Sequence, residues 1–144
     1  VGDRSHDTNA RAMELLRTLA HRTGQDGEEA IREEWARVWS RLRVARFQQQ
    51  RMQVRASAEP EATLSGAERA MDKLLLATNQ RLIGELASDL LGPAFVADTG
   101  EWGTFGWNRW LMGSLGYRIA GGTEEILKTM LAERVLALPR EPRP

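Results

Sequence analysis

Cysteine is absent from the sequence, and histidine occurs only twice in its 144 residues. The chain therefore has no disulfide and no thiolate to act as a nucleophile or a metal ligand. His6 lies near the start and His21 at a predicted helix end, and neither has other ligand residues clustered beside it. We therefore predict no metal site.

Motifs of two common catalytic classes are also missing. Met112 stands where the first glycine of a G-x-S-x-G nucleophile elbow would precede Ser114. No G-x-G-x-x-G follows a strand-like segment, so the sequence gives no sign of a dinucleotide-binding βαβ unit.

Neither sign of charge is in excess, because 20 Lys and Arg balance 20 Asp and Glu, and the pI is about 6.9. Nucleic-acid binding needs clustered excess cation, so we expect no nucleic-acid partner. No uncharged apolar run approaches the roughly 20 residues that cross a bilayer, and the first residues lack the apolar segment of a signal peptide. We expect a cytoplasmic protein without a membrane partner.

The apolar and charged fractions, 42% and 28%, are those of an ordinary globular domain. Alternation typical of strands is nearly absent, whereas apolar residues recur at spacings of three and four. We expect an all-α, up-and-down four-helix bundle of four to five helices, forming one domain over residues 1–144. The predicted helices cover residues 8–21, 27–56, 65–91, 104–119 and 123–138. The residues expected to be buried are Trp35, Leu42, Leu75, Leu82, Ile126 and Met130.

Three local signals mark helix ends. Ser65 and Glu68 have the spacing of a capping box just before an apolar run. Gly24 is placed to stop the first helix. The Gly92-Pro93 step ends the third helix, and residues 92–103 are predicted to form a loop.

The second half of the second helix is rich in arginine. Such a face is compatible with a nucleic-acid or membrane surface, but acid at the start and base at the end of a helix also complement its dipole. We interpret it as a solvated face. Trp35 and Trp39 lie on the apolar side of the same helix, and we interpret them as core residues, not stacking platforms.

Gly121-Gly122-Thr123 interrupts the helical pattern before the last helix. The glycines allow close approach of a ligand or backbone. Thr123 is a plausible N-cap, with the free amides of Glu124 and Glu125 pointing outward as an anion-binding corner. The same pattern also fits a helix start that binds nothing.

The longer stretch RIAGGTEEILKTMLAERVLALPREP (118–142) resembles the C-terminal signature of acyl-CoA dehydrogenases, most closely the actinobacterial type. Upstream segments follow the order of the family's C-terminal helical domain: MELLRTLAHRTGQ, RLRVARFQQQR, ERAMDKLLLATNQRLIGELASDLLGP and FGWNRWLMGSLGYRIAGGT. The resemblance implies a fragment of a three-domain flavoenzyme. FAD would lie between the domains and reach a neighbouring subunit. The enzyme would oxidise the Cα–Cβ bond of an acyl-CoA thioester with a fatty-acid or steroid side chain, as a homo-oligomer (dimer or tetramer).

The resemblance also assigns cofactor contacts. Thr123 and Glu125 match the family's contacts to the adenosine-diphosphate part of FAD, next to Gly122. Asp89 and Gly92 fall in the family's Q-x-L-G-G segment, which lines the neighbouring subunit's FAD, although Asp replaces Gln. The family's phosphate-binding arginine falls near Arg22, where R-x-x-F-G is degraded to HRTGQ. The cofactor-binding candidates are thus Arg22, Asp89, Gly92, Gly122, Thr123 and Glu125.

Many members carry the catalytic glutamate at the position of Gly121, and glycine cannot take a proton. Members with glycine here take their base from the preceding long helix, so the resemblance implies that the base lies upstream of Val1. We expect the chain alone to be inactive and to supply FAD and assembly contacts. Two alternatives stay open: a non-catalytic assembly bundle that has lost the site, and a generic helical interaction module that uses the arginine face.

Overall fold

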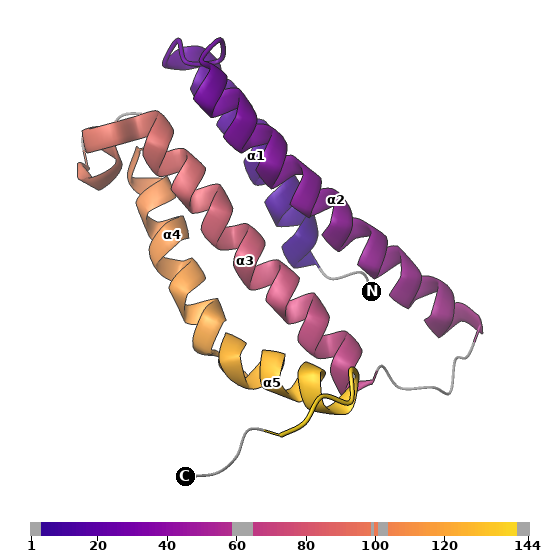
Figure 1. The fold of residues 1–144 in the computed structure, drawn as a ribbon. Coiled ribbons are helices and arrows are strands. Elements are labelled where there is room, and N and C mark those ends of the chain that lie inside the picture. Colours follow the sequence, from indigo (N-terminus) through magenta and orange to yellow (C-terminus); the bar gives the residue numbers. More distant parts are fainter. Residues whose placement is uncertain (1–3, 59–64, 99, 101–103, 141–144) are drawn as a thin grey trace.

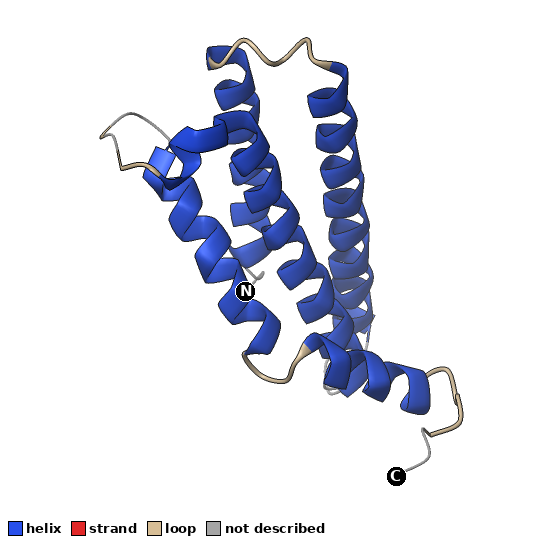
Figure 2. Ribbon diagram, turned by 60° about the vertical axis from the view of Figure 1, so that its left-hand side comes forward, coloured by secondary structure: helices blue, strands red, loops and turns tan. Residues whose placement is uncertain are grey.

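The computed structural model describes residues 4–58, 65–98, 100 and 104–140. These described residues form five α-helices and one 3₁₀ helix and contain no strand, which confirms the all-α prediction (Figure 2). The bounds are α1 Arg4–Arg22, α2 Glu29–Ala58, α3 Gly66–Leu91, η1 Gly92–Val96, α4 Thr104–Ile119 and α5 Glu124–Arg134.

The helices α1 to α4 run alternately up and down, which confirms the predicted bundle topology (Figure 1). The central element is α3, which contacts α1, α2, α4 and α5. After residue 119 the chain turns, and α5 lies across the lower end of the bundle in Figure 1. This turn is the corner at Gly121-Gly122-Thr123.

The core lies where α1, α2, α3 and α4 face one another. Leu16, Val38, Ile83 and Leu86 are fully buried at its centre, and each such side chain stabilises the fold by about 1.5–3 kcal/mol. The other buried members of this cluster are Ala12, Met13, Leu19, Ala20, Leu82, Ala87, Leu90, Phe95 and Trp107.

Helices α3 and α4 approach closely at Gly84. A Cβ atom at this position would lie 2.8 Å from Leu111 Cδ1 and 3.1 Å from its Cα. The absence of a side chain at Gly84 therefore sets the distance between the two helices.

The predicted helix-end signals are confirmed. The Ser65 N–H donates to Glu68 Oε2 at 2.8 Å, and the Glu68 N–H donates to Ser65 Oγ at 3.2 Å, which makes a complete capping box. Gly24 has a φ of 70°, in the left-handed region. The loop prediction for residues 92–103 is wrong at its start, because residues 92–96 form η1, with Pro93 in its first turn and Phe95 buried. Residues 99 and 101–103 lie outside the described residues.

The last helix departs most from prediction. It ends at Arg134 instead of residue 138, because Ala137 adopts a φ of 53° and the Leu138 N–H donates to the Ala132 carbonyl at 3.0 Å. Ile126, predicted to be buried, is 61% exposed. Of the other predicted core residues, Leu82 is buried, while Trp35, Leu42, Leu75 and Met130 are partly buried.

Candidate functional site

The corner between α4 and α5 is built by two glycines and a threonine. Gly121 and Gly122 have φ values of 66° and 107°, which side chains rarely adopt. Thr123 is extended, and its Oγ1 accepts the Ile126 N–H at 3.3 Å. The glycines therefore redirect the chain, and Thr123 is the N-cap that the sequence predicts.

Ion pairs surround this corner. Glu124 is only 12% exposed and accepts from Arg118 Nε at 3.0 Å, with Lys128 Nζ at 3.7 Å. The backbone N–H of Glu125 itself, followed by the Thr123 hydroxyl, holds the pKa of Glu125 below its usual value.

A cavity of about 370 Å³ opens beside the corner. It presents one guanidinium, two carboxylates and an apolar wall, so it suits a ligand with hydroxyl or amino donors and a flat apolar part. The lining residues are Leu115, Arg118, Ile119, Thr123, Glu124 and Glu125. The structure thus brings Thr123 and Glu125 together, next to Gly122.

The other three candidates lie at the opposite end of the bundle. Arg22 ends α1, Asp89 lies in the last turn of α3, and Gly92 follows it. Gln25 Nε2 donates to the Leu90 carbonyl at 2.7 Å, which ties these two helix ends together. The start of α4 packs on η1 and its end leads into the corner, and at 1.5 Å per residue its 16 residues span about 24 Å. The six candidates therefore form two separate groups in one chain (Figure 1).

Asp89 has an unusual electrostatic environment. Partial desolvation raises the pKa of its carboxyl group, and the nearby carboxylates of Glu34 and Glu85 raise it further. Three carboxyl groups thus lie near one another at this end of α3, and their negative potential does not favour a bare anion.

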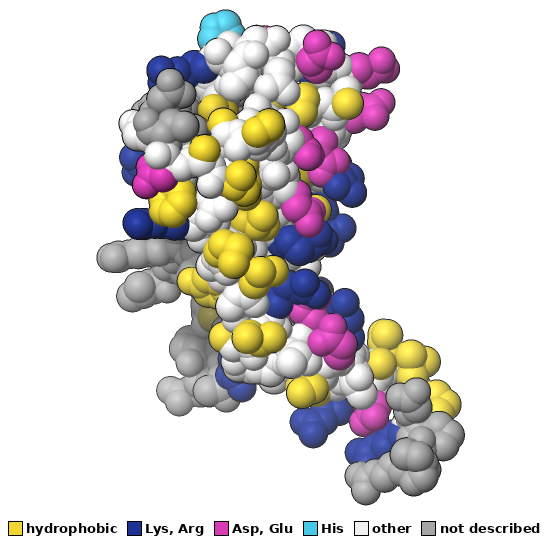
Figure 3. Space-filling view, turned by 90° about the vertical axis from the view of Figure 1, so that its left-hand side faces the viewer, with side chains coloured by type: hydrophobic (Ala, Val, Ile, Leu, Met, Phe, Trp, Pro, Cys, Tyr) yellow, Lys and Arg dark blue, Asp and Glu magenta, His cyan; other side chains and the backbone are white. Residues whose placement is uncertain are grey.

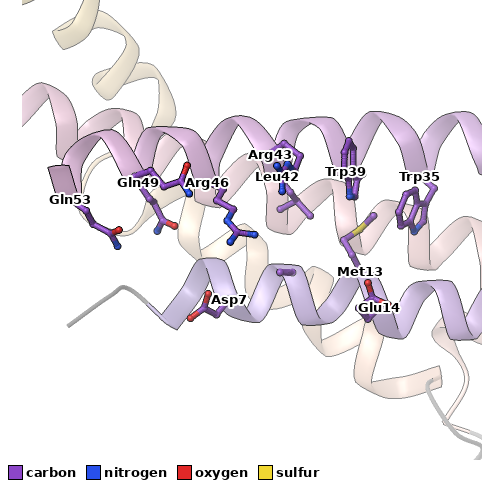
Figure 4. A pocket seen from close by; sticks show the side chains of 12 residues that line it. Asp7, Met13, Glu14, Trp35, Trp39, Leu42, Arg43, Arg46, Gln49 and Gln53 are labelled. Atoms are coloured by element: carbon purple, nitrogen blue, oxygen red, sulfur yellow. The ribbon is translucent and has the colours of Figure 1, made fainter.

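The sequence analysis missed a groove of about 500 Å³ between α1 and α2 (Figure 4). Trp39, predicted to be a core residue, lines this groove and is 46% exposed. The Arg43 guanidinium lies 5.6 Å from the centroid of the Trp39 ring and 5.4 Å from that of Phe47. The spacing of four between these residues was the available signal for a cation–π stack. Because Asp7 and Glu14 also line the groove, it does not favour a bare anion.

Apolar side chains gather over α4 on the face shown in Figure 3. Met112, Leu115 and Ile119 are 60%, 43% and 68% exposed. Contiguous exposed apolar surface of this kind marks a contact face, and here it runs down to the corner.

Among the described residues, no group of three or more His, Cys, Asp or Glu could hold a metal ion. His21 Nδ1 lies 3.0 Å from Asp26 Oδ2, and the side chain of His6 lies outside the described residues. None of the described helices has the length and apolar character needed to span a membrane.

The family model for the C-terminal domain of acyl-CoA dehydrogenases matches residues 5–136 of this chain. Acyl-CoA dehydrogenase IpdE1 of Mycobacterium tuberculosis is 36% identical over 133 residues, which are 92% of this chain and 33% of that protein. IpdE1 of Mycolicibacterium smegmatis is also 36% identical, over 92% of this chain and 31% of that protein. The chain thus spans about one third of the length of these curated relatives.

Two solved structures share the fold. One is described as Tcur3481-Tcur3483 steroid ACAD, with a TM-score of 0.77 and 20% identity over 92% of this chain and 35% of that one. Its G363A variant gives a TM-score of 0.75 and 19% identity over 95% of this chain and 37% of that one.

Proposed function

The chain belongs to the family of acyl-CoA dehydrogenase C-terminal domains, and from this premise we propose that it is one domain of a longer, three-domain FAD enzyme. That enzyme oxidises the Cα–Cβ bond of an acyl-CoA thioester in the cytoplasm, as a homodimer or homotetramer. The helical domain supplies FAD contacts and subunit contacts. The observation that carries the proposal is the family match over residues 5–136 together with the ordered glycine corner.

The corner cavity fits the adenosine half of FAD better than its diphosphate. Glu124 and Glu125 outnumber Arg118 among the lining charges, so phosphate oxygens would be repelled. Carboxylates accept hydrogen bonds from ribose hydroxyl and adenine amino groups, and Leu115 with Ile119 offers an apolar wall for a ring. We propose that Gly122, Thr123 and Glu125 hold this half of the cofactor.

The opposite end of the bundle has the chemistry for phosphate. We propose that Arg22 contacts the FAD of a neighbouring subunit, and that Gly92 allows close approach there because its φ of 52° suits glycine. We propose that Asp89 accepts a hydrogen bond from a hydroxyl or amino group of this cofactor, because a carboxylate is an acceptor. The separation of about 24 Å along α4 supports two sites shared between subunits over one site within a chain.

FAD, when bound, supplies the hydride acceptor for the β-hydrogen of the substrate. The α-proton needs a base, and Gly121 cannot provide one. A Cβ atom at position 121 would meet no atom within 4 Å, so the space next to the backbone here is open. We propose that the base comes from outside this chain.

The steroid description of the similar solved structure favours a steroid side-chain thioester over a simple fatty acyl-CoA as the substrate. We propose this class for the enzyme that contains the chain. The glycine at position 121 favours a second candidate function, a non-catalytic assembly subunit that keeps the bundle without a base.

One experiment separates these functions. The protein that carries this chain is purified, its flavin is quantified, and acyl-CoA thioesters with steroid and fatty side chains are added anaerobically. We expect the flavin absorbance to bleach with a thioester, most with the steroid class. If the protein binds flavin stoichiometrically but neither class of thioester bleaches the flavin absorbance, the proposed enzyme activity is contradicted. The result would then support the non-catalytic assembly subunit. The isolated 144-residue chain is expected to be colourless and inactive.

A further inference from the structure

We infer that Lys73, a residue outside every contact assigned so far, is the positioning residue that holds the corner in its binding geometry. Its Nζ donates to the Gly122 carbonyl, across 49 positions of sequence. Lys73 lies in α3 and is partly buried. This inference rests on the proposed function, because it concerns the corner to which FAD is assigned.

The corner needs a contact with another helix to keep its conformation. Two consecutive residues with positive φ are both glycines, and glycine has the largest conformational freedom to lose on folding. The neighbouring hydrogen bonds are local: the Ala120 N–H donates to the Gly116 carbonyl at 2.9 Å, and the Leu127 N–H to the Thr123 carbonyl at 3.0 Å. These bonds define α4 and α5 but do not fix the corner relative to the bundle. The bond from Lys73 fixes the corner relative to the bundle, because Lys73 belongs to α3, the central helix.

The bond also sets the direction of a donor. No peptide bond of the described residues is cis, and in a planar trans peptide the carbonyl and the N–H point in opposite directions. Since the Gly122 carbonyl points to Lys73, the N–H of Thr123 points away from α3. Lys73 thus turns the first backbone donor of the corner outward, where a ligand can reach it.

The charge of Lys73 changes the balance at the corner. The adjoining cavity has two carboxylates, Glu124 and Glu125, against the single guanidinium of Arg118. Lys128 lies 3.7 Å from Glu124, and Lys73 adds a further cation behind the glycines. The ammonium therefore offsets the negative potential that would oppose a cofactor carrying phosphates.

The test compares Lys73→Met and Lys73→Arg in the protein that carries this chain. Methionine keeps an unbranched stem without the donor, and arginine restores a cationic donor. Lys128→Met is the matched control, because Lys128 reaches the corner only through the Glu124 side chain, at 3.7 Å. Two quantities are measured: hydrogen exchange of the Ile126 and Leu127 amides in the flavin-free form, and the Kd for FAD by fluorescence titration. Far-UV circular dichroism checks folding, and Lys73→Gln replaces Lys73→Met if the latter does not fold.

We expect Lys73→Met to speed exchange of both amides and to weaken FAD binding roughly tenfold, as the loss of one charge-assisted hydrogen bond implies. Lys73→Arg should stay close to the wild type in both measurements. Lys128→Met should keep the wild-type exchange rates and lose less FAD affinity than Lys73→Met. Unchanged amide exchange in Lys73→Met would overturn the inference, and so would faster exchange with an unchanged Kd for FAD. An equal loss of FAD affinity in Lys128→Met would also overturn it. If the wild type binds no FAD, the proposed function fails, while exchange alone still decides whether Lys73 holds the corner.

Discussion

Helices α3 and α5 both carry apolar residues at helical spacing, but only α3 buries them. Twelve of the 26 residues of α3 are buried, whereas α5 has no buried residue among its 11. The reason is position: α3 contacts α1, α2, α4 and α5, while α5 lies across one end of the bundle and packs on α3. The difference teaches that α3 makes the fold, whereas the apolar residues of α5 are covered only in part by the described chain.

The segment after α5 strengthens this contrast. Val135, Leu136 and Leu138 are 52%, 66% and 52% exposed, and apolar side chains are visible beyond α5 in Figure 3. Together with the exposed apolar residues of α4, they form the surface that other domains or subunits would cover in the proposed enzyme.

The largest expected effect comes from truncating one apolar residue in each helix. Leu86→Ala in α3, at a position with 0% exposure, should lower the free energy of unfolding by about 2–5 kcal/mol through lost burial and a cavity. Ile126→Ala in α5, at 61% exposure, should change it by less than about 0.5 kcal/mol. Urea unfolding of the chain measures both. Similar losses in the two variants would end the contrast between α3 and α5.

A second pair of variants tests the close approach of α3 and α4. Gly84→Ala places a methyl group 2.8 Å from Leu111 Cδ1 and should destabilise the fold by about 1–3 kcal/mol through overpacking. Gly113→Ala in α4 meets nothing within 4 Å and should stabilise the helix by up to about 1 kcal/mol. Thermal unfolding of the pair gives the answer, and a neutral Gly84→Ala would mean that the helices separate at little cost.

Glu68, in the first turn of α3, gives a prediction about how the stability of the fold depends on pH. The Ser65 N–H and hydroxyl, followed by Arg55, hold the pKa of Glu68 below its usual value. A lowered folded pKa contributes stability that is present above the unfolded pKa, near 4.3, and is lost as pH falls through the folded pKa. Glu68→Gln should therefore lower the urea midpoint at pH 7 and lower it less at pH 3. Glu33→Gln, at an exposed site in α2, is the control and should show no such dependence.

The smallest effect is expected at the other end of α3. Desolvation and neighbouring carboxylates raise the pKa of Asp89, so its charged form opposes folding above the usual aspartate pKa. Asp89→Asn should raise the urea midpoint slightly at pH 7 and leave it unchanged at pH 3. Asp98→Asn, at an exposed site after η1, serves as the comparison. A lower midpoint for Asp89→Asn at pH 7 would show that this carboxylate stabilises the fold.

Most of the fold could be predicted from the sequence, because helix periodicity and the Ser65–Glu68 capping box are local signals. The errors at Ile126 and Trp39 have one cause. Periodicity identifies the apolar side of a helix, but it does not say whether the surface that covers this side belongs to the same chain. For this reason it predicted Leu82 in α3 correctly and Ile126 in α5 incorrectly, while Leu75 and Met130 are both partly buried.

The features of the candidate site also differ in whether a local sequence signal predicts them. The Gly121-Gly122-Thr123 corner and its N-cap follow from adjacent residues, so the sequence located them. The bond from Lys73 to Gly122 spans 49 positions, and the separation of Arg22 from Thr123 depends on the path of α3. Neither has a local signal, so only the structure shows them.

The central claim is that the corner at the start of α5 is a FAD contact and not merely a helix start. The direct measurement is flavin absorbance per subunit in Thr123→Val of the protein that carries this chain. Valine removes the hydroxyl that accepts the Ile126 N–H and should cost the helix about 1 kcal/mol. Thr129→Val, at an exposed site in α5, is the matched control. We expect flavin occupancy to fall in Thr123→Val with the bundle still folded, and to stay at the wild-type level in Thr129→Val. Full occupancy in Thr123→Val would contradict the claim.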